Sequence, residues 1–361
     1  MGNDEAALSQ LLLDLQQQFL VKILGKLHTF LGLQVQRSGT ELLLHQTSYA
    51  KALLDKAGMT DCHPLQTPLS AKTPTSPADE SPFSDPYLYR SLAGSLQYLT
   101  ITRPDLSFAV NQVCQHMNKP LNYHFQMLKR ILRYLKGTVS AGLPIQLGNF
   151  TLSAYADADW AGDKIDRKST SGYCVFLGRT LISWSAKKQS TISRSSTEAE
   201  YRALTAAATE IVWLRRLLQD FNIPCNIPTL LYCDSVSAIS LANNPVFHAR
   251  TKHIEIDQHY IRECIKSKII TLHHISTNDQ TADIFTKSLP ITRFLLLRNK
   301  LTLCTRTVNL RGTVKQTKQS GTTPVNMKIS TSQGSNRKQS SRPCRLKKEI
   351  TEASQQRITR Q

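Results

Sequence analysis

The strongest constraint on the fold is the order of hydrophobic patterns between residues 150 and 304. Three short β-prone runs come first, separated by polar or glycine-containing turns, at 150–160, 172–177 and 180–185. A long helical pattern follows, and strand-like and helical stretches then alternate, at 197–221, 230–233, 235–242, 253–268, 269–275 and from 281. This order predicts a mixed sheet with helices on its faces. We therefore expect an α/β (α+β) domain over residues 150–304.

The preceding residues, 1–145, carry mostly helical patterns. Helical spacing over 5–20 and 49–58 flanks a hairpin signal at 30–45. Residues 64–86 hold six prolines among Ser, Thr and Asp, which predicts an extended linker or surface loop. Helical periodicity then resumes from 87 to 136, where a glycine is placed to end the helix. We expect residues 1–145 to form a separate, mostly helical domain.

Charge is unevenly distributed along the 361 residues, whose formal net charge is +19. Residues 305–361 contain 13 of the 45 Lys and Arg residues but only 2 of the 26 acidic ones, and few large apolar side chains. Such a segment cannot form a core, so a disordered basic tail is expected there. A basic chain attracts polyanions, most often nucleic acid. No apolar run approaches the roughly 20 residues of a membrane helix, so no membrane partner is expected.

Cysteine and histidine spacing does not predict a zinc site. The eight cysteines include no Cys-x-x-Cys pair. They predict free thiols in a reducing compartment, and we expect an intracellular protein of the cytoplasm or nucleus. His253 and His259 lie six residues apart and His273 adjoins His274, but neither pair has a matching Cys/His partner.

Four acidic residues stand where strands end or helices begin. They are Asp157 in the first strand, Glu200 in the first turn of the long helix, Asp234 at the end of the fourth strand and Asp283 at the start of the last helix. Such positions converge on one edge of a mixed sheet. Four carboxylates brought together repel one another unless a cation neutralises them. Oxygen ligands without a Cys/His set favour Mg²⁺ or Mn²⁺, and two such ions can promote phosphodiester cleavage.

Alternative roles for these acids fit the sequence less well. Taken singly, an acid such as Glu198 or Glu200 is favourable at any helix N-terminus. Asp157 and Asp159 also form an Asp-x-Asp pair, as in the metal motif of a glycosyltransferase, but no nucleotide-binding βαβ pattern precedes them. A transposase-type site would place its Glu last, whereas here the Glu comes second and an Asp comes last.

Several dense motifs run through the chain. In the second half they are Tyr155–Gly162, Arg167–Tyr173, Ser195–Tyr201, Arg250–Ile254 and Ala282–Lys287, and upstream they are Phe30–Gly32, Arg103–Asp105 and Leu132–Thr138. Over nearly all of residues 1–312, the chain resembles the C-terminal part of the Pol polyprotein of plant copia-type LTR retrotransposons. By this resemblance, residues 1–145 correspond to the end of a reverse transcriptase palm with its thumb and connection. The Asp pair of the polymerase would precede the first residue, so no polymerase activity is expected.

The resemblance also implies a fold and a reaction for residues 150–304. These residues would adopt a ribonuclease H-like fold, in which Asp157, Glu200, Asp234 and Asp283 are the catalytic acids that hold two Mg²⁺ or Mn²⁺ ions. Glu200 matches the motif better than Glu198. The implied reaction is endonucleolytic hydrolysis of the RNA strand of an RNA–DNA hybrid. The alternative is a catalytically silent, nucleic-acid-binding remnant of a retroelement.

The implied partners are an RNA–DNA hybrid and other proteins of the same retroelement. Small polar side chains can contact the 2′-hydroxyls of RNA across its shallow minor groove, and basic side chains can hold phosphates. The candidates for these contacts are Arg167, Lys168, Ser169, Thr170, Lys187, Lys188, Ser193, Ser195, Lys252 and His253.

Overall fold

A computed structural model describes residues 4–305 except Leu24, Lys26, Thr40, 71–79 and 245–254. The expected basic tail lies outside the described residues apart from its first position. Lys252 and His253, two of the candidate nucleic-acid contacts, also lie outside them. Among the helices of the described part, none combines the length and apolar character needed to cross a bilayer.

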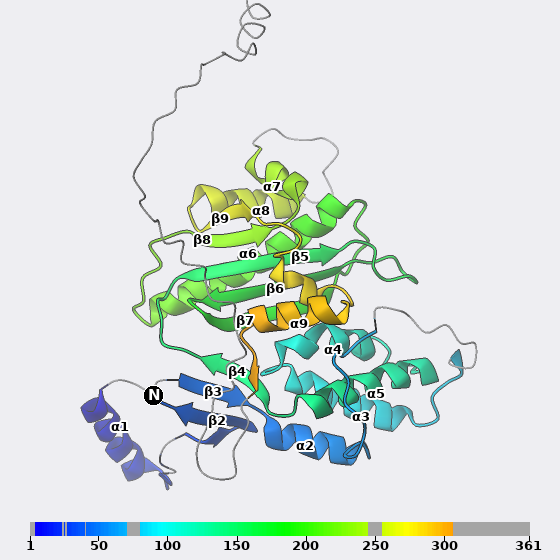
Figure 1. Ribbon diagram of the computed structural model, residues 1–361. Helices are drawn as coiled ribbons and strands as arrows, with labels where there is room; N and C mark the ends of the chain where they lie inside the picture. The colour runs from blue at the N-terminus through cyan, green and yellow to red at the C-terminus, as the bar shows by residue number, and fades with distance from the viewer. Residues whose placement is uncertain are drawn as a thin grey trace, which may run out of the picture. The chain divides into compact units, whose positions relative to one another are not determined.

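The first sheet is antiparallel and is built largely from the N-terminal part of the chain (Figure 1). Its strands, in the order β1-β2-β3-β4-β10, are β1 (Thr29–Phe30), β2 (Leu33–Ser38), β3 (Glu41–His45), β4 (Ala141–Ile145) and β10 (Cys304–Thr305). The β2–β3 pair is the hairpin that the sequence predicted. β4 was not predicted, because Gly142 and Pro144 weaken a strand pattern.

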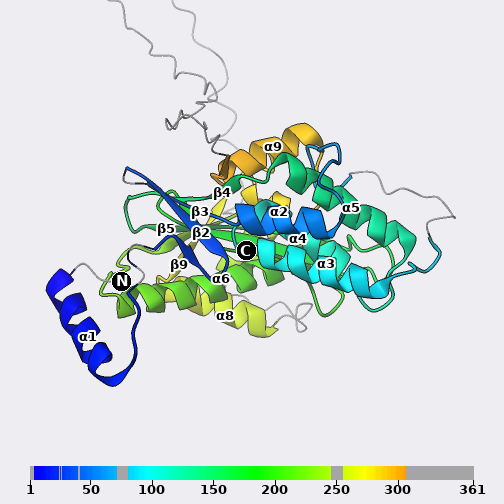
Figure 2. The ribbon, with the colours of Figure 1, turned by 90° about the horizontal axis from the view of Figure 1, so that it is seen from below.

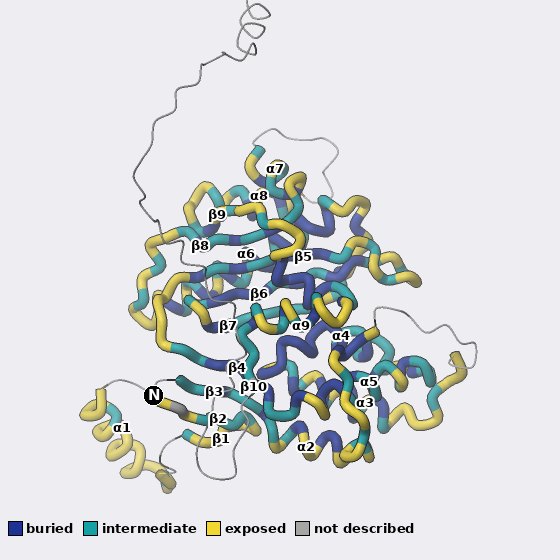
Figure 3. Tube along the Cα trace, viewed as in Figure 1, coloured by how far each residue is buried: buried dark blue, intermediate teal, exposed yellow. Residues whose placement is uncertain are grey.

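Helices form the rest of the first part. They are α1 (Glu5–Gln18), α2 (Thr47–Lys56), α3 (Pro86–Leu99), α4 (Ser107–Cys114) and α5 (Asn122–Gly137), with a 3₁₀ turn, η2 (Pro104–Leu106), before α4. The predicted helical stretch over 87–136 is therefore three helices. α1 buries no residue, whereas α3, α4 and α5 each bury an apolar face (Figure 3).

A buried ion pair ties the turn before α4 to the end of α5. Arg103 is 2% exposed and donates to both carboxylate oxygens of Asp105, at 2.9 and 2.8 Å. The same guanidinium donates to the Thr138 carbonyl at 2.8 Å and to its hydroxyl at 2.7 Å. Tyr134 donates its hydroxyl to Asp105 at 2.5 Å, so both charges are hydrogen-bonded as burial requires.

The second sheet confirms the mixed α/β class expected for residues 150–304. Its strands, in the order β7-β6-β5-β8-β9, are β5 (Leu152–Asp159), β6 (Thr170–Leu177), β7 (Thr180–Lys188), β8 (Thr229–Cys233) and β9 (Ile270–His274). β5, β6 and β7 are antiparallel neighbours, while β8 runs parallel to β5 and β9 runs parallel to β8.

Both faces of this sheet are covered (Figure 2). One face packs against α6 (Ser196–Asp220), with α7 (Val236–Asn243) and α8 (Glu255–Lys266) beside it. The other face packs against the 3₁₀ turn η4 (Thr281–Phe285) and α4, and α9 (Ile291–Lys300) packs on η4. Neighbouring side chains of β6 alternate between the two cores, with Cys174 on the η4 side and Val175 on the α6 side.

The predicted last helix is two elements. Asp283 lies in η4, and α9 begins eight residues later, after Pro290. The proline explains the break, because it disfavours helical backbone at the residue before it and is well tolerated where a helix starts. Asp283 is therefore held on a short buried turn.

The core on the η4 side is continuous with the helices of the first part. Leu96 of α3 and Leu128 of α5 belong to the same buried cluster as Ile284 and Leu297. Figure 3 shows this buried region beneath α9. β10 pairs with β4, and the indole of Trp184 donates to the Thr100 carbonyl at 3.2 Å. The boundary near residues 145–150 stays a prediction, but side chains from both of its sides are buried together.

Candidate active site

The four predicted acids come from four elements around the centre of the second sheet. Asp157 lies on β5, the central strand. Glu200 is the fifth residue of α6, which packs over β5, so it lies just beyond the first turn in which it was expected. Asp234 directly follows β8, the parallel neighbour of β5. Asp283 lies on η4. Asp157, Glu200 and Asp283 are buried, and Asp234 is partly exposed.

Hydrogen bonds fix Glu200 beside Asp157. Its Oε1 accepts from the backbone N–H of Ala158, the next residue of β5, at 3.2 Å. The side chain of Ser195 accepts from the Glu198 N–H at 3.1 Å, so this serine caps α6. This cap fixes where α6 begins and thereby sets the position of Glu200, five residues after the cap.

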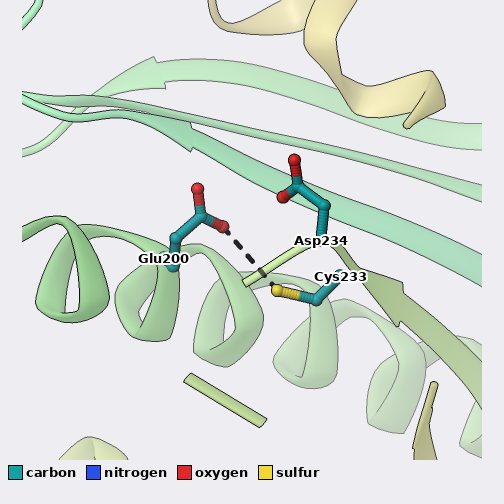
Figure 4. Close-up of side chains that lie close together, drawn as sticks. All are labelled: Glu200, Cys233 and Asp234. Carbon is teal, nitrogen blue, oxygen red and sulfur yellow. Dashed lines mark hydrogen bonds between the residues drawn. The ribbon is translucent and has the colours of Figure 1, made fainter. Parts of the chain in front are cut away.

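Glu200 also lies close to the end of β8 (Figure 4). One potential ligand atom from each of Glu200, Cys233 and Asp234 lies within 4.8 Å of the others. The Cys233 thiol is buried and lies 3.8 Å from Oε2 of Glu200. Oδ2 of Asp234 accepts from the Thr277 hydroxyl at 2.9 Å, which orients this carboxylate.

η4 is held against β5 by two hydrogen bonds, and a glycine of β6 leaves space for it. The Gln280 amide donates to the Ala156 carbonyl at 2.9 Å. The Thr286 hydroxyl donates to Oδ2 of Asp157. Gly172 leaves room for the turn, because a Cβ at this position would lie 2.7 Å from Cβ of Phe285 and 2.7 Å from Cγ2 of Thr286. These contacts bring Asp283 to Asp157 across more than a hundred residues of sequence.

Two basic side chains partly neutralise the acids. Nζ of Lys287 lies 2.9 Å from Oδ1 of Asp283 and 3.4 Å from Oδ2 of Asp157. A guanidinium nitrogen of Arg293, on α9, lies 3.1 Å from Oδ2 of Asp283. Among the described residues, the positive charges of Lys287 and Arg293 therefore lie beside four carboxyl groups.

The electrostatics show an excess of negative charge. Burial raises the pKa of Asp157 to about 6, with Asp283 and Asp234 adding to the rise while Lys287 opposes it. Burial raises the pKa of Glu200 to about 9, with Asp157 and Asp234 adding to the rise. Burial also raises the pKa of Asp159. Hard carboxylate oxygens short of positive charge fit a divalent cation such as Mg²⁺ or Mn²⁺.

The proposed hydroxyl contacts are mostly internal. Ser169 is buried, and its Oγ accepts from the Ala161 N–H at 3.1 Å. Ser193 is buried and donates to the Gln189 side chain at 2.6 Å. Thr170 is buried at the start of β6, and Ser195 is used as the helix cap described above.

The proposed basic contacts lie near the end of β5. Lys188 forms ion pairs with Asp163 at 2.6 Å and Asp166 at 3.0 Å, and Lys168 lies 3.8 Å from the same Asp166. Arg167 and Lys187 are exposed. The β5–β6–β7 register brings Asp159, Thr170 and Lys188 into line, so these basic residues lie on the sheet edge next to the acids.

Sequence reasoning did not assign several residues that shape the site. Thr286 and Lys287 belong to the Ala282–Lys287 motif, so the signal was present, but a contact with Asp157 depends on how η4 docks. Cys233 precedes one of the predicted acids. Arg293 had no sequence signal, because its role depends on α9 folding back toward η4.

No protein-family model matches this chain. It is 46% identical over 301 residues to the retrovirus-related Pol polyprotein from transposon RE1 of Arabidopsis thaliana, covering 83% of this chain and 20% of that protein. It is 44% identical over 301 residues to the corresponding protein from transposon RE2 of the same plant, covering 83% of this chain and 21% of that protein. The chain thus spans about a fifth of the length of these curated relatives.

Among solved structures, the chain is similar to LC11-RNase H1, isolated from compost by a metagenomic approach. The TM-score is 0.31 and the sequence identity is 15%. The similarity covers 38% of this chain and 93% of that one.

Proposed function

This chain belongs to the retrovirus-related Pol polyproteins of plant copia-type transposons, and from this premise we propose that residues 150–304 carry a ribonuclease H-type hydrolase. The proposed reaction is endonucleolytic cleavage of the RNA strand of an RNA–DNA hybrid, dependent on Mg²⁺ or Mn²⁺. The observation that carries this proposal is the gathering of four carboxylates, three of them buried, around β5.

Such a cluster is costly without an incoming cation. Burial of an ionised carboxylate requires compensating charge, and otherwise the group takes up a proton. Burial raises the pKa of Glu200 to about 9 even though Lys287 opposes the rise, so this side chain is neutral at pH 7 without a bound metal ion. A site designed only for stability would bury apolar side chains here.

The four acids have one shared place in the proposed mechanism. Asp157, Glu200, Asp234 and Asp283 would hold a pair of divalent cations, which would supply activation of water and stabilisation of the leaving oxygen of a phosphodiester. Asp157 lies next to Glu200 on one side and to Asp283 on the other. Thr286 and Ala158 fix the carboxylates by hydrogen bonds, so their oxygens are held in place before substrate arrives.

Basic groups on the neighbouring sheet edge support binding of a nucleic acid. Arg167 and Lys187 are exposed there and can reach phosphates, whereas the ion-paired Lys188 shapes the loop. Ser169 and Ser193 are hydrogen-bonded inside the protein, so preference for RNA would depend on other groups, including exposed backbone.

The test uses the purified full chain with a labelled RNA–DNA hybrid, and with RNA–RNA and DNA–DNA duplexes as controls. Metal-dependent cutting of the RNA strand of the hybrid alone is the expected result. Asp157→Asn should abolish cutting and retain binding, because it removes one ligand and leaves the basic edge intact. Asp55→Asn, at an exposed acid of α2, is the matched control and should cut normally. Hybrid binding without cutting by the folded wild type would instead identify a silent remnant.

A further inference from the structure

One cation of the cluster is held differently from the other. Arg293 is anchored by the backbone carbonyls of Thr277 and Asn278 as well as by Asp283. It therefore forms part of the framework that positions η4. Lys287 meets the cluster through carboxylates, Asp283 at 2.9 Å and Asp157 at 3.4 Å.

The Lys287 ammonium and a bound metal ion would compete for the same carboxylate oxygens. Asp157 and Asp283 are two of the four proposed ligands, and the ammonium bridges one oxygen of each. A divalent cation bound to those same oxygens would lie within a few ångströms of the ammonium, and the two positive charges would repel strongly in this buried setting.

The Lys287 ammonium can also move away from the two carboxylates. Its side chain is 35% exposed, and it lies beyond the end of η4, before α9 begins. Lysine carries its charge on a flexible four-carbon stem, so the ammonium can swing into solvent without moving the backbone. The loss of one ion pair is then compensated when a cation of higher charge takes its place.

We propose that Lys287 is an exchangeable counter-ion, which holds the Asp157–Asp283 edge in the metal-free protein and is displaced by a divalent cation. The inference rests on the proposed metal site. In the metal-free state the ammonium prevents repulsion between the two acids, and its displacement makes the apparent metal affinity lower than the carboxylates alone would give. Lys287 is thus a positioning residue that tunes metal affinity.

The experiment measures Mn²⁺ binding to the full-length chain by titration calorimetry, without substrate. Lys287→Met should bind Mn²⁺ about tenfold more tightly than the wild type. Without metal, this variant should also have a lower melting temperature than the wild type. Added Mn²⁺ should raise its melting temperature by more than it raises that of the wild type. Lys287→Gln, which keeps a polar group without the charge, is a second variant in case the methionine disturbs folding, and folding is checked by circular dichroism.

The matched control is Lys300→Met, which removes another ion-paired lysine, 2.9 Å from Asp279, outside the four-acid cluster. It should change the Mn²⁺ dissociation constant less than about twofold, since exposed charges interact weakly at a distance. Unchanged or weaker Mn²⁺ binding by folded Lys287 variants overturns the proposal, and so does a failure of every variant to bind Mn²⁺.

A hybrid-cleavage assay on the same proteins separates this proposal from the enzymatic one. Tighter Mn²⁺ binding by Lys287→Met with no cutting by any protein would support the counter-ion and refute the ribonuclease. Cutting by the wild type with unchanged Mn²⁺ affinity in the Lys287 variants would support the ribonuclease and refute the counter-ion.

Discussion

Gly172 on β6 is the direct register partner of Asp157 on β5. Because this glycine has no side chain, η4 can lie against the sheet. Gly172 therefore pairs with Asp157 and also leaves the space for the turn that carries Asp283. Gly172→Ala places a methyl group 2.7 Å from atoms of Phe285 and Thr286. We expect it to destabilise the protein by roughly 1–3 kcal/mol, as overpacking does, and to reduce hybrid cleavage strongly.

The control for this substitution is Gly94→Ala. Gly94 lies within α3, and a Cβ there meets nothing within 4 Å. An added methyl group should be neutral or stabilising by about 0.5–1 kcal/mol, because alanine is the better helix former. Urea unfolding of both variants measures the change in the free energy of unfolding that each substitution causes. Equal stability of the two variants would mean that η4 does not depend on the open space at Gly172.

Glu200 should make the metal-free protein less stable as pH rises. Burial, Asp157 and Asp234 raise its folded pKa to about 9, far above its ordinary value of 4.5. Between these values the folded state binds more protons than the unfolded state, so stability falls with increasing pH. Thermal melts in chelator across pH 5 to 9 should show this decline, and Glu200→Gln should flatten it. Saturating Mg²⁺ or Mn²⁺ should restore stability to the wild type at high pH by binding the ionised form.

His124 should produce the opposite slope at lower pH. Burial and the nearby His116 lower its pKa to about 4, and its Nδ1 accepts from the Leu121 N–H at 3.0 Å at the start of α5. Because the unfolded histidine takes up a proton below about pH 6.5 and the folded one does not, stability is lost as pH falls from 6.5 toward 4. His124→Gln can keep the N-terminal hydrogen bond without titrating. If its melting temperature follows the wild type over this range, another group causes the acid sensitivity.

The buried Arg103–Asp105 pair should contribute strongly to the stability of the fold. Arg103→Ala leaves Asp105 as an uncompensated buried charge and removes two donors from Thr138. We expect a loss of about 3–5 kcal/mol in the free energy of unfolding, measured by denaturant titration. Lys168→Ala removes a partly exposed pair at 3.8 Å and should cost less than about 1 kcal/mol. Comparable losses in the two variants would contradict this ranking.

Local signals in the sequence were enough to select four acids that the structure brings close together. Their positions at strand ends or near helix starts depend on neighbouring residues, whereas the roles of Asp157, Glu200, Asp234 and Asp283 stay a prediction. The mixed sheet with helices on its faces also follows from the alternation of strand and helix patterns.

Features that depend on distant contacts were not predictable in this way. Gly142 and Pro144 disguise β4, which is stabilised by pairing with β3 and β10. Their polar side chains made Ser169 and Ser193 candidates for nucleic-acid contact. Both are buried, and hydrogen bonds within the protein satisfy their hydroxyls. The approach of Lys287 to Asp157 requires the docked turn, which no local pattern encodes.

The packing of α9 against the first part of the chain ties the stability of the two parts together. A frameshift after Pro290 would delete α9 and β10 and leave all four clustered acids in the coding sequence. It would nevertheless uncover Leu128 and Tyr134 of the first part, because α9 supplies Leu297 to their core and Phe294 packs edge-on against Tyr134. Damage to α9 therefore also destabilises the residues before 145. The two parts are expected to lose stability together when α9 is disrupted.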